Sequence, residues 1–123
     1  MATSSPDALI ATARRWLDCF ATHDLDALIS LYAKDARHTS PKLRALRPET
    51  GGQLIGQASL REWWADAFAR LPGLRYIEAS LTANGERVFM EYRRQVPGEP
   101  EMPVAEVLEI SQGLIVASRV YHG

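Results

Sequence analysis

Two residues near the end of this 123-residue chain have the types and spacing for acid-base chemistry: Glu106 and Arg119. They lie in residues 104–122, where two alternating runs with β-branched residues flank Gln112-Gly113, a pattern typical of an antiparallel hairpin. A two-residue turn at Gln112-Gly113 places the carboxylate directly opposite the guanidinium on one largely apolar face. A three-residue loop would instead place Glu106 opposite Ser118.

A charge pair on an apolar sheet face has two interpretations. In the first, Glu106 forms the polar floor of a pocket and acts as a general base, while Arg119 keeps it ionised and anchors an anionic or carbonyl-bearing ligand. In the second, the pair is a structural ion pair that satisfies two groups near a sheet edge. Perturbed carboxylates favour functional clefts without proving them, so both remain open.

His38 is the third candidate for proton transfer, because a neutral imidazole exchanges protons near pH 7. Its alternative role is to cap a turn or to bond a backbone carbonyl. The three histidines lack metal-ligand spacing and companion cysteines, since Cys19 is the only cysteine, so we expect no metal site. We also expect no organic cofactor.

Aromatic residues recur along the chain and could form the wall of a pocket for a flat, hydrophobic ligand. Adjacent Trp63 and Trp64 differ by about 100° around a helix, so one should enter the core while the other lines a mouth or an interface. Buried tyrosine hydroxyls need partners, which makes Tyr92 and Tyr121 the better pocket candidates. Each residue has core packing as its alternative. The predicted ligand-binding set is Trp16, Tyr32, Trp63, Trp64, Phe68, Met90, Tyr92, Leu108 and Tyr121.

Helices are predicted in the first half of the chain. Ser5-Pro6-Asp7 provides a cap, a proline at the first helical position and an acid near the positive dipole end, and the helix should end near Thr22-His23. Asp24 should cap a second, shorter helix whose apolar stripe reaches Tyr32. A short strand over residues 36–40 would carry His38.

The middle of the chain has a different composition. Residues 41–52, PKLRALRPETGG, have little periodicity and predict a long surface loop that could act as a lid. A brief strand over 53–55 follows. Ser59 and Glu62 match a capping box for a third helix, which Pro72-Gly73 should stop.

The second half predicts sheet. Asn84-Gly85 is a strong hairpin signal, and a type I′ turn there pairs Leu81 with Val88 and Ile77 with Tyr92. Met90 then shares the apolar face, whereas Phe89 lies among polar residues on the opposite face.

Composition limits the classes of function. The chain fits one domain, and its net charge of −1 with intermixed signs gives no footprint for nucleic acid or an anionic membrane surface. No apolar stretch approaches the roughly 20 residues that span a bilayer, and we see no secretory signal. A cytoplasmic protein is the simplest expectation.

Four stretches carry a resemblance to a known family: WLDCF in the first helix, then residues 24–36, 55–64 and 112–122. Their order and spacing are similar to those of the SnoaL-like, nuclear transport factor 2-like superfamily over nearly the whole chain. The resemblance implies a single α+β domain, 1–123, in which a cone-shaped, curved antiparallel sheet wraps around a pocket with three helices from the N-terminal half. It also implies homodimers formed through the sheet.

The resemblance implies several activities, because the family includes polyketide cyclases, ketosteroid isomerases, epoxide hydrolases and non-catalytic binding modules. Many cyclase-like members end the last strand with an acidic residue that transfers a proton, and the matching position here is Gly123. Glu106 with Arg119 resembles part of the aspartate-arginine-aspartate set of the epoxide hydrolases.

Two hypotheses of function follow. In the leading one, the chain binds a small hydrophobic molecule, a cyclic or carbonyl compound, and acts on it as an acid-base isomerase, cyclase or hydrolase. Glu106 would transfer the proton, and Tyr92, Tyr121 and His38 would donate hydrogen bonds to oxyanion charge. In the alternative, a non-catalytic dimerisation or partner-binding module uses the outer sheet face around Phe89.

Overall fold

The computed structural model describes residues 5–122 as four α-helices, one 3₁₀ turn and six strands. The helical elements are α1 (Pro6–Thr22), α2 (Leu25–Ser30), α3 (Pro41–Leu46), η1 (Pro48–Thr50) and α4 (Gln57–Arg70). The strands are β1 (Tyr32–Thr39), β2 (Gln53–Ile55), β3 (Arg75–Asn84), β4 (Arg87–Gln95), β5 (Met102–Ser111) and β6 (Leu114–His122).

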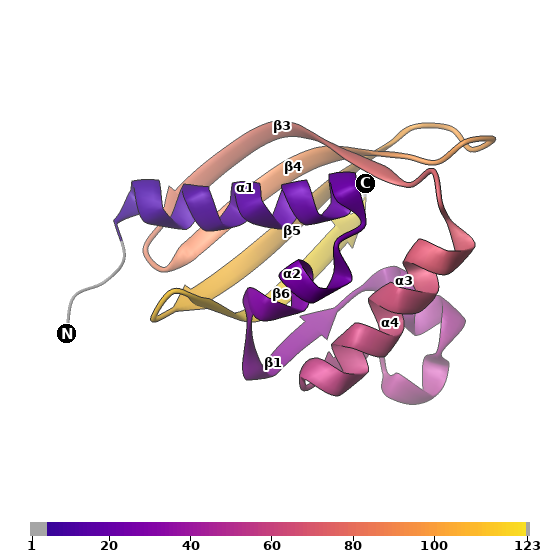
Figure 1. Ribbon diagram of the computed structural model, residues 1–123, viewed down its shortest axis with the longest axis horizontal. Helices are drawn as coiled ribbons and strands as arrows, with labels where there is room; N and C mark the ends of the chain where they lie inside the picture. The colour runs from indigo at the N-terminus through magenta and orange to yellow at the C-terminus, as the bar shows by residue number, and fades with distance from the viewer. Residues whose placement is uncertain (1–4, 123) are drawn as a thin grey trace.

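The strands form one curved, unclosed sheet in the order β2-β1-β6-β5-β4-β3, and the fold is α+β, as predicted. Every neighbouring pair is antiparallel except β1 and β6, which run parallel. In Figure 1, α1 lies across the sheet beside β3 and β4, while α4 and α3 gather at the other end near β1. The helices therefore cover one face of the sheet, and the space between them and the sheet holds the core.

Helix α1 follows the prediction at both ends. The Ser5 hydroxyl accepts a hydrogen bond from the Ala8 backbone N–H at 3.1 Å, and Pro6 occupies the first helical position. The helix ends at His23, which adopts the left-handed conformation with φ 54°. Its buried face includes Leu9, Trp16 and Phe20, which pack against the sheet.

The second helix is shorter than predicted. Asp24 caps it through the Ala27 N–H, as expected, but the helix ends at Ser30, and Tyr32 begins β1 instead of completing the helical stripe. A strand places the Tyr32 ring where its hydroxyl accepts a hydrogen bond from the Trp16 indole at 3.0 Å. A spacing of three or four residues could not reveal this, because the deciding contact comes from another element.

The prediction of a surface loop over residues 41–52 is wrong. This segment contains α3 and η1, and Ser40 caps α3 by accepting from the Lys42 and Leu43 N–H groups. Ser40-Pro41 repeats the cap and first-turn proline of Ser5-Pro6, so a helix signal was present. Leu43 is fully buried and fixes α3 to the core.

Helix α4 also begins earlier than predicted. It starts at Gln57 after Gly56, whose φ of 92° suits glycine, so the Ser59–Glu62 capping box is not used. The Gln57 side chain instead donates to the Tyr32 carbonyl at 2.8 Å and ties the helix start to β1.

The β3–β4 hairpin has a different register from the predicted one. Its two-residue turn is Gly85-Glu86, so Leu81 pairs with Met90 and not with Val88. Beyond a bulge at Ala79 the register shifts again, and Tyr76 pairs with Arg94. A bulge adds one residue to one strand, so the side chains beyond it exchange faces relative to a regular ladder.

The β5–β6 hairpin keeps the predicted turn and then departs from the predicted ladder. Gln112 and Gly113 both have positive φ, 53° and 79°, as a type I′ turn requires, and Ile110 pairs with Ile115. The register then shifts, because Glu109 pairs with Ala117 and leaves Val116 as an extra residue in β6.

Truncating a buried side chain on the inner sheet face should lower the free energy of unfolding. Leu108, at the centre of β5, is fully buried, so Leu108→Ala should lower the free energy of unfolding by about 2–5 kcal/mol. Leu114→Ala, at a position 40% exposed beside the turn, should cost about 0.5 kcal/mol or less. Urea denaturation of the two variants measures the difference, and equal costs would contradict the described packing.

Candidate functional site

The carboxyl group of Glu106 lies on the inner face of the sheet, between Met90 of β4 and Val120 of β6. The residue is 2% exposed. The Tyr92 hydroxyl donates a hydrogen bond to its Oε1 atom at 2.7 Å, whereas Oε2 has no hydrogen-bond partner among the described residues. A buried polar atom without a partner is rare and points to a missing one, such as a ligand.

Burial without a counter-ion controls the protonation of Glu106. Desolvation raises the pKa of Glu106 to about 8, and the hydrogen bond from Tyr92 only partly opposes that rise. The group is therefore mostly protonated at neutral pH. With Oε1 accepting from Tyr92, the carboxyl proton sits on Oε2, the atom that is free to donate.

The predicted pairing of Glu106 with Arg119 is wrong. The extra residue Val116 shifts the ladder by one, so Glu106 pairs with Val120 and Arg119 lies opposite Val107. Because neighbouring residues of a strand point to opposite faces, Arg119 is on the outer face, where it forms an ion pair with Glu109. Arg119 therefore does not keep Glu106 ionised, and Glu106 does not have the character of the predicted general base at neutral pH.

His38 is the second buried ionisable group. It is 3% exposed, and its Nδ1 atom lies 2.7 Å from the Ser118 hydroxyl oxygen. Burial lowers the pKa of His38 to about 4, so its ring is neutral at pH 7. The parallel pairing of β1 with β6 places His38 directly beside Ser118.

A chain of hydrogen bonds determines which His38 nitrogen carries the proton. The Trp16 indole N–H can only donate, and it donates to the Tyr32 hydroxyl oxygen at 3.0 Å. Tyr32 must then donate onward, and its remaining partner is the Ser118 hydroxyl at 3.0 Å. Ser118 in turn donates to Nδ1 of His38. The ring proton therefore sits on Nε2, which is left as a donor.

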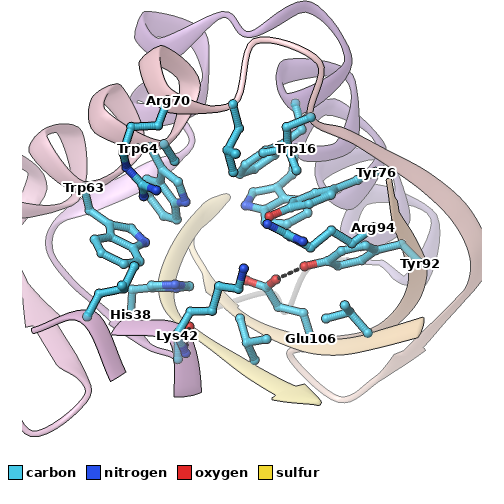
Figure 2. Close-up of a pocket in the computed structure, with 18 residues that line it drawn as sticks. Trp16, His38, Lys42, Trp63, Trp64, Arg70, Tyr76, Tyr92, Arg94 and Glu106 are labelled. Carbon is cyan, nitrogen blue, oxygen red and sulfur yellow. Dashed lines mark hydrogen bonds between the residues drawn. The ribbon is translucent and has the colours of Figure 1, made fainter. Parts of the chain in front are cut away.

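A cavity of about 90 Å³ lies between the inner sheet face and the helices α1, α3 and α4. Figure 2 shows His38 and Glu106 pointing into it from two sides, with the Tyr92–Glu106 hydrogen bond at its floor. The two residues that carry neutral donors, His38 and Glu106, therefore line one cavity. Sites for drug-sized ligands usually measure roughly 300–1,000 Å³. This cavity, at about 90 Å³, is well below that range.

One wall of the cavity is a stack of aromatic rings. Phe20 packs on Tyr76 with centroids 4.4 Å apart, and Tyr76 stacks on Tyr92 at 4.3 Å. Trp16 adds a tilted contact with Phe20 at 4.5 Å. Such rings present a flat apolar surface, while the tyrosine hydroxyls keep polar atoms near Glu106.

The two adjacent tryptophans of α4 are both buried, 7% and 4% exposed, and both line the cavity, so the predicted division between core and mouth is not seen. Trp64 packs inward against Tyr32 and His38, with ring centroids 5.2 and 5.0 Å apart. Trp63 also borders the cavity, and the guanidinium of Arg47 lies 5.7 Å from its ring centroid. Trp64 is therefore tied to the hydrogen-bonded core, and Trp63 to the segment that contains α3.

The predicted ligand-binding residues fall into three groups. Trp16, Trp63, Trp64 and Tyr92 line the cavity, together with the predicted proton-transfer residues His38 and Glu106. Tyr32, Met90 and Leu108 are fully buried in the core, and Phe68 stacks on His23, away from the cavity lining. Tyr121 is 54% exposed on the outer face, where the shifted ladder pairs it with Ala105.

Several lining residues were not predicted. Tyr76 reaches the cavity because the bulge at Ala79 turns it inward. The register shift in β6 turns Ser118 to the inner face, where it contacts His38 but does not line the cavity. Lys42, Arg70 and Arg94 also line it. A glycine-free bulge leaves no dependable sequence signal, whereas the helix signal at Ser40-Pro41 would have placed Lys42 on an ordered element.

Across residues 5–122, no group of three or more histidine, cysteine, aspartate and glutamate residues is arranged to hold a metal ion. The helices described for this chain include none with the length and apolar character needed to cross a bilayer.

The family is decided by a comparison with protein-family models. The model of the SnoaL-like domain matches residues 13–118. The chain belongs to the SnoaL-like family. The match covers α1 through most of β6 and so includes the hydrogen-bonded residues around Glu106 and His38. No curated protein matches the sequence.

Solved structures share the fold of this SnoaL-like domain. A SnoaL-like protein of unknown function from Burkholderia thailandensis has 24% identity and a TM-score of 0.87, over 97% of this chain and 99% of that one. TerC, co-crystallised with polyporic acid, has 18% identity and a TM-score of 0.81, over 94% and 92%. A protein of Kribbella flavida, provisionally assigned as a ketosteroid isomerase, has 18% identity and a TM-score of 0.78, over 96% and 79%. At these identities the likeness concerns the fold.

The two buried groups predict opposite pH dependences of stability. Folded Glu106 keeps its proton up to pH about 8, while an unfolded glutamate loses it near 4.5, so the folded state binds more protons between these values and stability falls as pH rises. Folded His38 protonates only near pH 4 against 6.5 when unfolded, so its contribution makes stability rise between pH 4 and 6.5.

Above pH 6.5, of these two groups only Glu106 still makes the stability depend on pH. We expect the free energy of unfolding to fall by about 2 kcal/mol between pH 6.5 and 8. Glu106→Gln should remove this fall, whereas Glu109→Gln, on the outer face of the same strand, should keep it. Urea denaturation at half-unit pH intervals measures the slope, and an unchanged slope in Glu106→Gln would contradict the assigned protonation.

Proposed function

We propose that this SnoaL-like domain binds a small hydrophobic cyclic compound with a carbonyl group and catalyses a cofactor-independent proton transfer on it. The reaction would be of the isomerase, cyclase or hydrolase type. One observation carries the proposal: Glu106 is buried, protonated at neutral pH, and faces a cavity with a carboxyl atom that has no partner.

The two neutral donors explain how the site would act on a carbonyl group. When a water molecule takes a proton from the carbon beside the carbonyl group, negative charge develops on the carbonyl oxygen, and hydrogen bonds from preorganised donors stabilise that charge. Oε2–H of Glu106 would be one donor and Nε2–H of His38 another. In a site shielded from water such bonds are stronger than in solution.

Tyr92 has a positioning role in this scheme. Its hydroxyl donates to Oε1 of Glu106 at 2.7 Å, which holds the carboxyl plane and keeps the proton on Oε2. Burial, and after it the nearby carboxyl group, raise the pKa of Tyr92 well above its usual value, so the hydroxyl remains protonated and continues to donate. A group with a pKa near 8 is also matched to proton transfer at physiological pH.

The comparisons support the proposal at the level of the fold. TerC was crystallised with polyporic acid, so a structure of this shape has accommodated an organic molecule. The Kribbella flavida protein was provisionally assigned as a ketosteroid isomerase. The aromatic stack of Phe20, Tyr76 and Tyr92 suits a ring-shaped ligand.

Hydrogen-deuterium exchange tests the chemistry without a known substrate. In D₂O, the protein should accelerate exchange of the α-protons of small cyclic ketones such as cyclohexanone, followed by proton NMR. Glu106→Gln should lower the accelerated rate by about 10²-fold or more, because it removes the acidic proton while preserving shape. Glu109→Gln should match the original protein. A rate equal to that of buffer for every ketone, or full activity in Glu106→Gln, would exclude this mechanism.

A second candidate function is assembly through the outer sheet face, as a homodimer or with another partner. Phe89, Val107 and Arg119 form one rung of this face, and Ala105 and Tyr121 are paired on the next. Phe89 and Tyr121 are 41% and 54% exposed, so large rings face outward from β4 and β6, on either side of β5. Exposed aromatic rings on one sheet face suit contact with a second protein.

We therefore expect a homodimer that Phe89→Glu dissociates, because a carboxylate facing an apolar partner surface loses its hydration. Ile55→Glu is the matched control: Ile55 is 55% exposed on the distant edge strand β2, and its change should leave the dimer intact. Sedimentation velocity over a concentration series measures the association. A monomer at all concentrations, or a dimer unaffected by Phe89→Glu, would exclude this surface.

A further inference from the structure

Three cationic side chains from three different elements reach the cavity. Lys42 comes from α3, Arg70 from the end of α4, and Arg94 from β4 (Figure 2). The only carboxyl group among the described lining residues is that of Glu106, which is neutral at pH 7. The lining is therefore positively charged although the whole chain has a net charge of −1.

Two of the three cations have carboxylate partners outside the cavity lining. Arg94 donates from Nη1 to Glu99 at 3.0 Å, and Arg70 pairs with Asp66 at 2.7 Å. No carboxylate of the described residues lies within 4 Å of the Lys42 ammonium. Three cations and two paired carboxylates leave one uncompensated positive charge beside the cavity.

The cations beside the cavity are partly shielded from water, which strengthens the effect of the uncompensated charge. The Arg94 side chain is only 7% exposed, and its ion pair uses Nη1, so the other N–H groups of the guanidinium remain as donors. The pKa of Lys42 is lowered, first by partial burial and then by repulsion from Arg94, while attraction to Glu99 partly opposes the shift and repulsion from Arg70 adds least. These cations face one another, and a bound anion would relieve their repulsion.

We infer that the natural ligand carries one carboxylate, held between Lys42 and Arg94 in the cavity, while its cyclic carbonyl part lies against the aromatic stack. This deepens the proposed function by naming the substrate class, a compact cyclic oxo acid, and it rests on that function. A planar carboxylate matches the guanidinium fork. A single negative charge balances the single excess charge, whereas a phosphate dianion would leave the site negative.

A matched pair of ligands tests the inference: 4-oxocyclohexanecarboxylate and 4-oxocyclohexanecarboxamide, which share ring, ketone and size but differ in charge. Isothermal titration calorimetry at pH 7 should give a dissociation constant about tenfold or more lower for the carboxylate. Lys42→Met should remove that preference without weakening the carboxamide. Lys42→Arg should retain it, because the charge is kept.

Lys34→Met is the control, because it makes the same change at an exposed lysine outside the cavity lining and should leave both affinities unchanged. Arg94→Lys adds a test at a buried position, where loss of the planar fork should weaken the carboxylate alone. Melting temperatures of the variants confirm that each is folded.

The outcomes separate the two proposals. Equal affinity of the original protein for both ligands, or a carboxylate preference that survives in Lys42→Met, overturns the inference and leaves the proposed function standing. Tighter binding of inorganic phosphate than of the carboxylate also overturns it. Failure of both ring compounds to bind at millimolar concentration overturns the proposed function itself, and the inference with it.

Discussion

The structure depends on one carboxyl group that is buried without a counter-ion. Glu106 sits at the centre of the inner sheet face, and its one hydrogen bond comes from Tyr92. Removal from water costs a charged carboxylate far more than one neutral hydrogen bond returns, so the group holds its proton. Glu106 therefore adds no charge to the inner face, and the site keeps an acidic proton at neutral pH.

A second neutral donor arises from a different physical cause. The His38 ring is oriented by a sequence of hydrogen bonds that begins at an indole N–H, a group that can only donate. Each hydroxyl in this chain of hydrogen bonds donates to the next group. The direction of donation from Trp16 on α1 therefore decides which nitrogen of His38 on β1 carries the proton. Packing of the first helix against the sheet thus determines a chemical property on the far side of the cavity.

The cavity is lined by groups of different electrostatic character. Neutral polar groups and apolar side chains line it together with the cations of α3, α4 and β4. Lys42 stands where it does because α3 is a capped helix anchored by Leu43 and not a mobile loop.

The amino-acid sequence by itself determined the family, the α+β class, the caps of α1 and α2, and the turn of the last hairpin, because these depend on neighbouring residues. It also singled out Glu106, His38, Tyr92 and the tryptophans as residues of chemical interest. Only the tertiary structure decided which of them meet. The extra residue Val116 shifts the pairing of β5 with β6, so Glu106 and Arg119 do not face each other. The bulge at Ala79 turns Tyr76 inward. A bulge forms where packing of the whole sheet favours extra twist, so local pattern does not reveal it, yet it decides the face of each side chain beyond it.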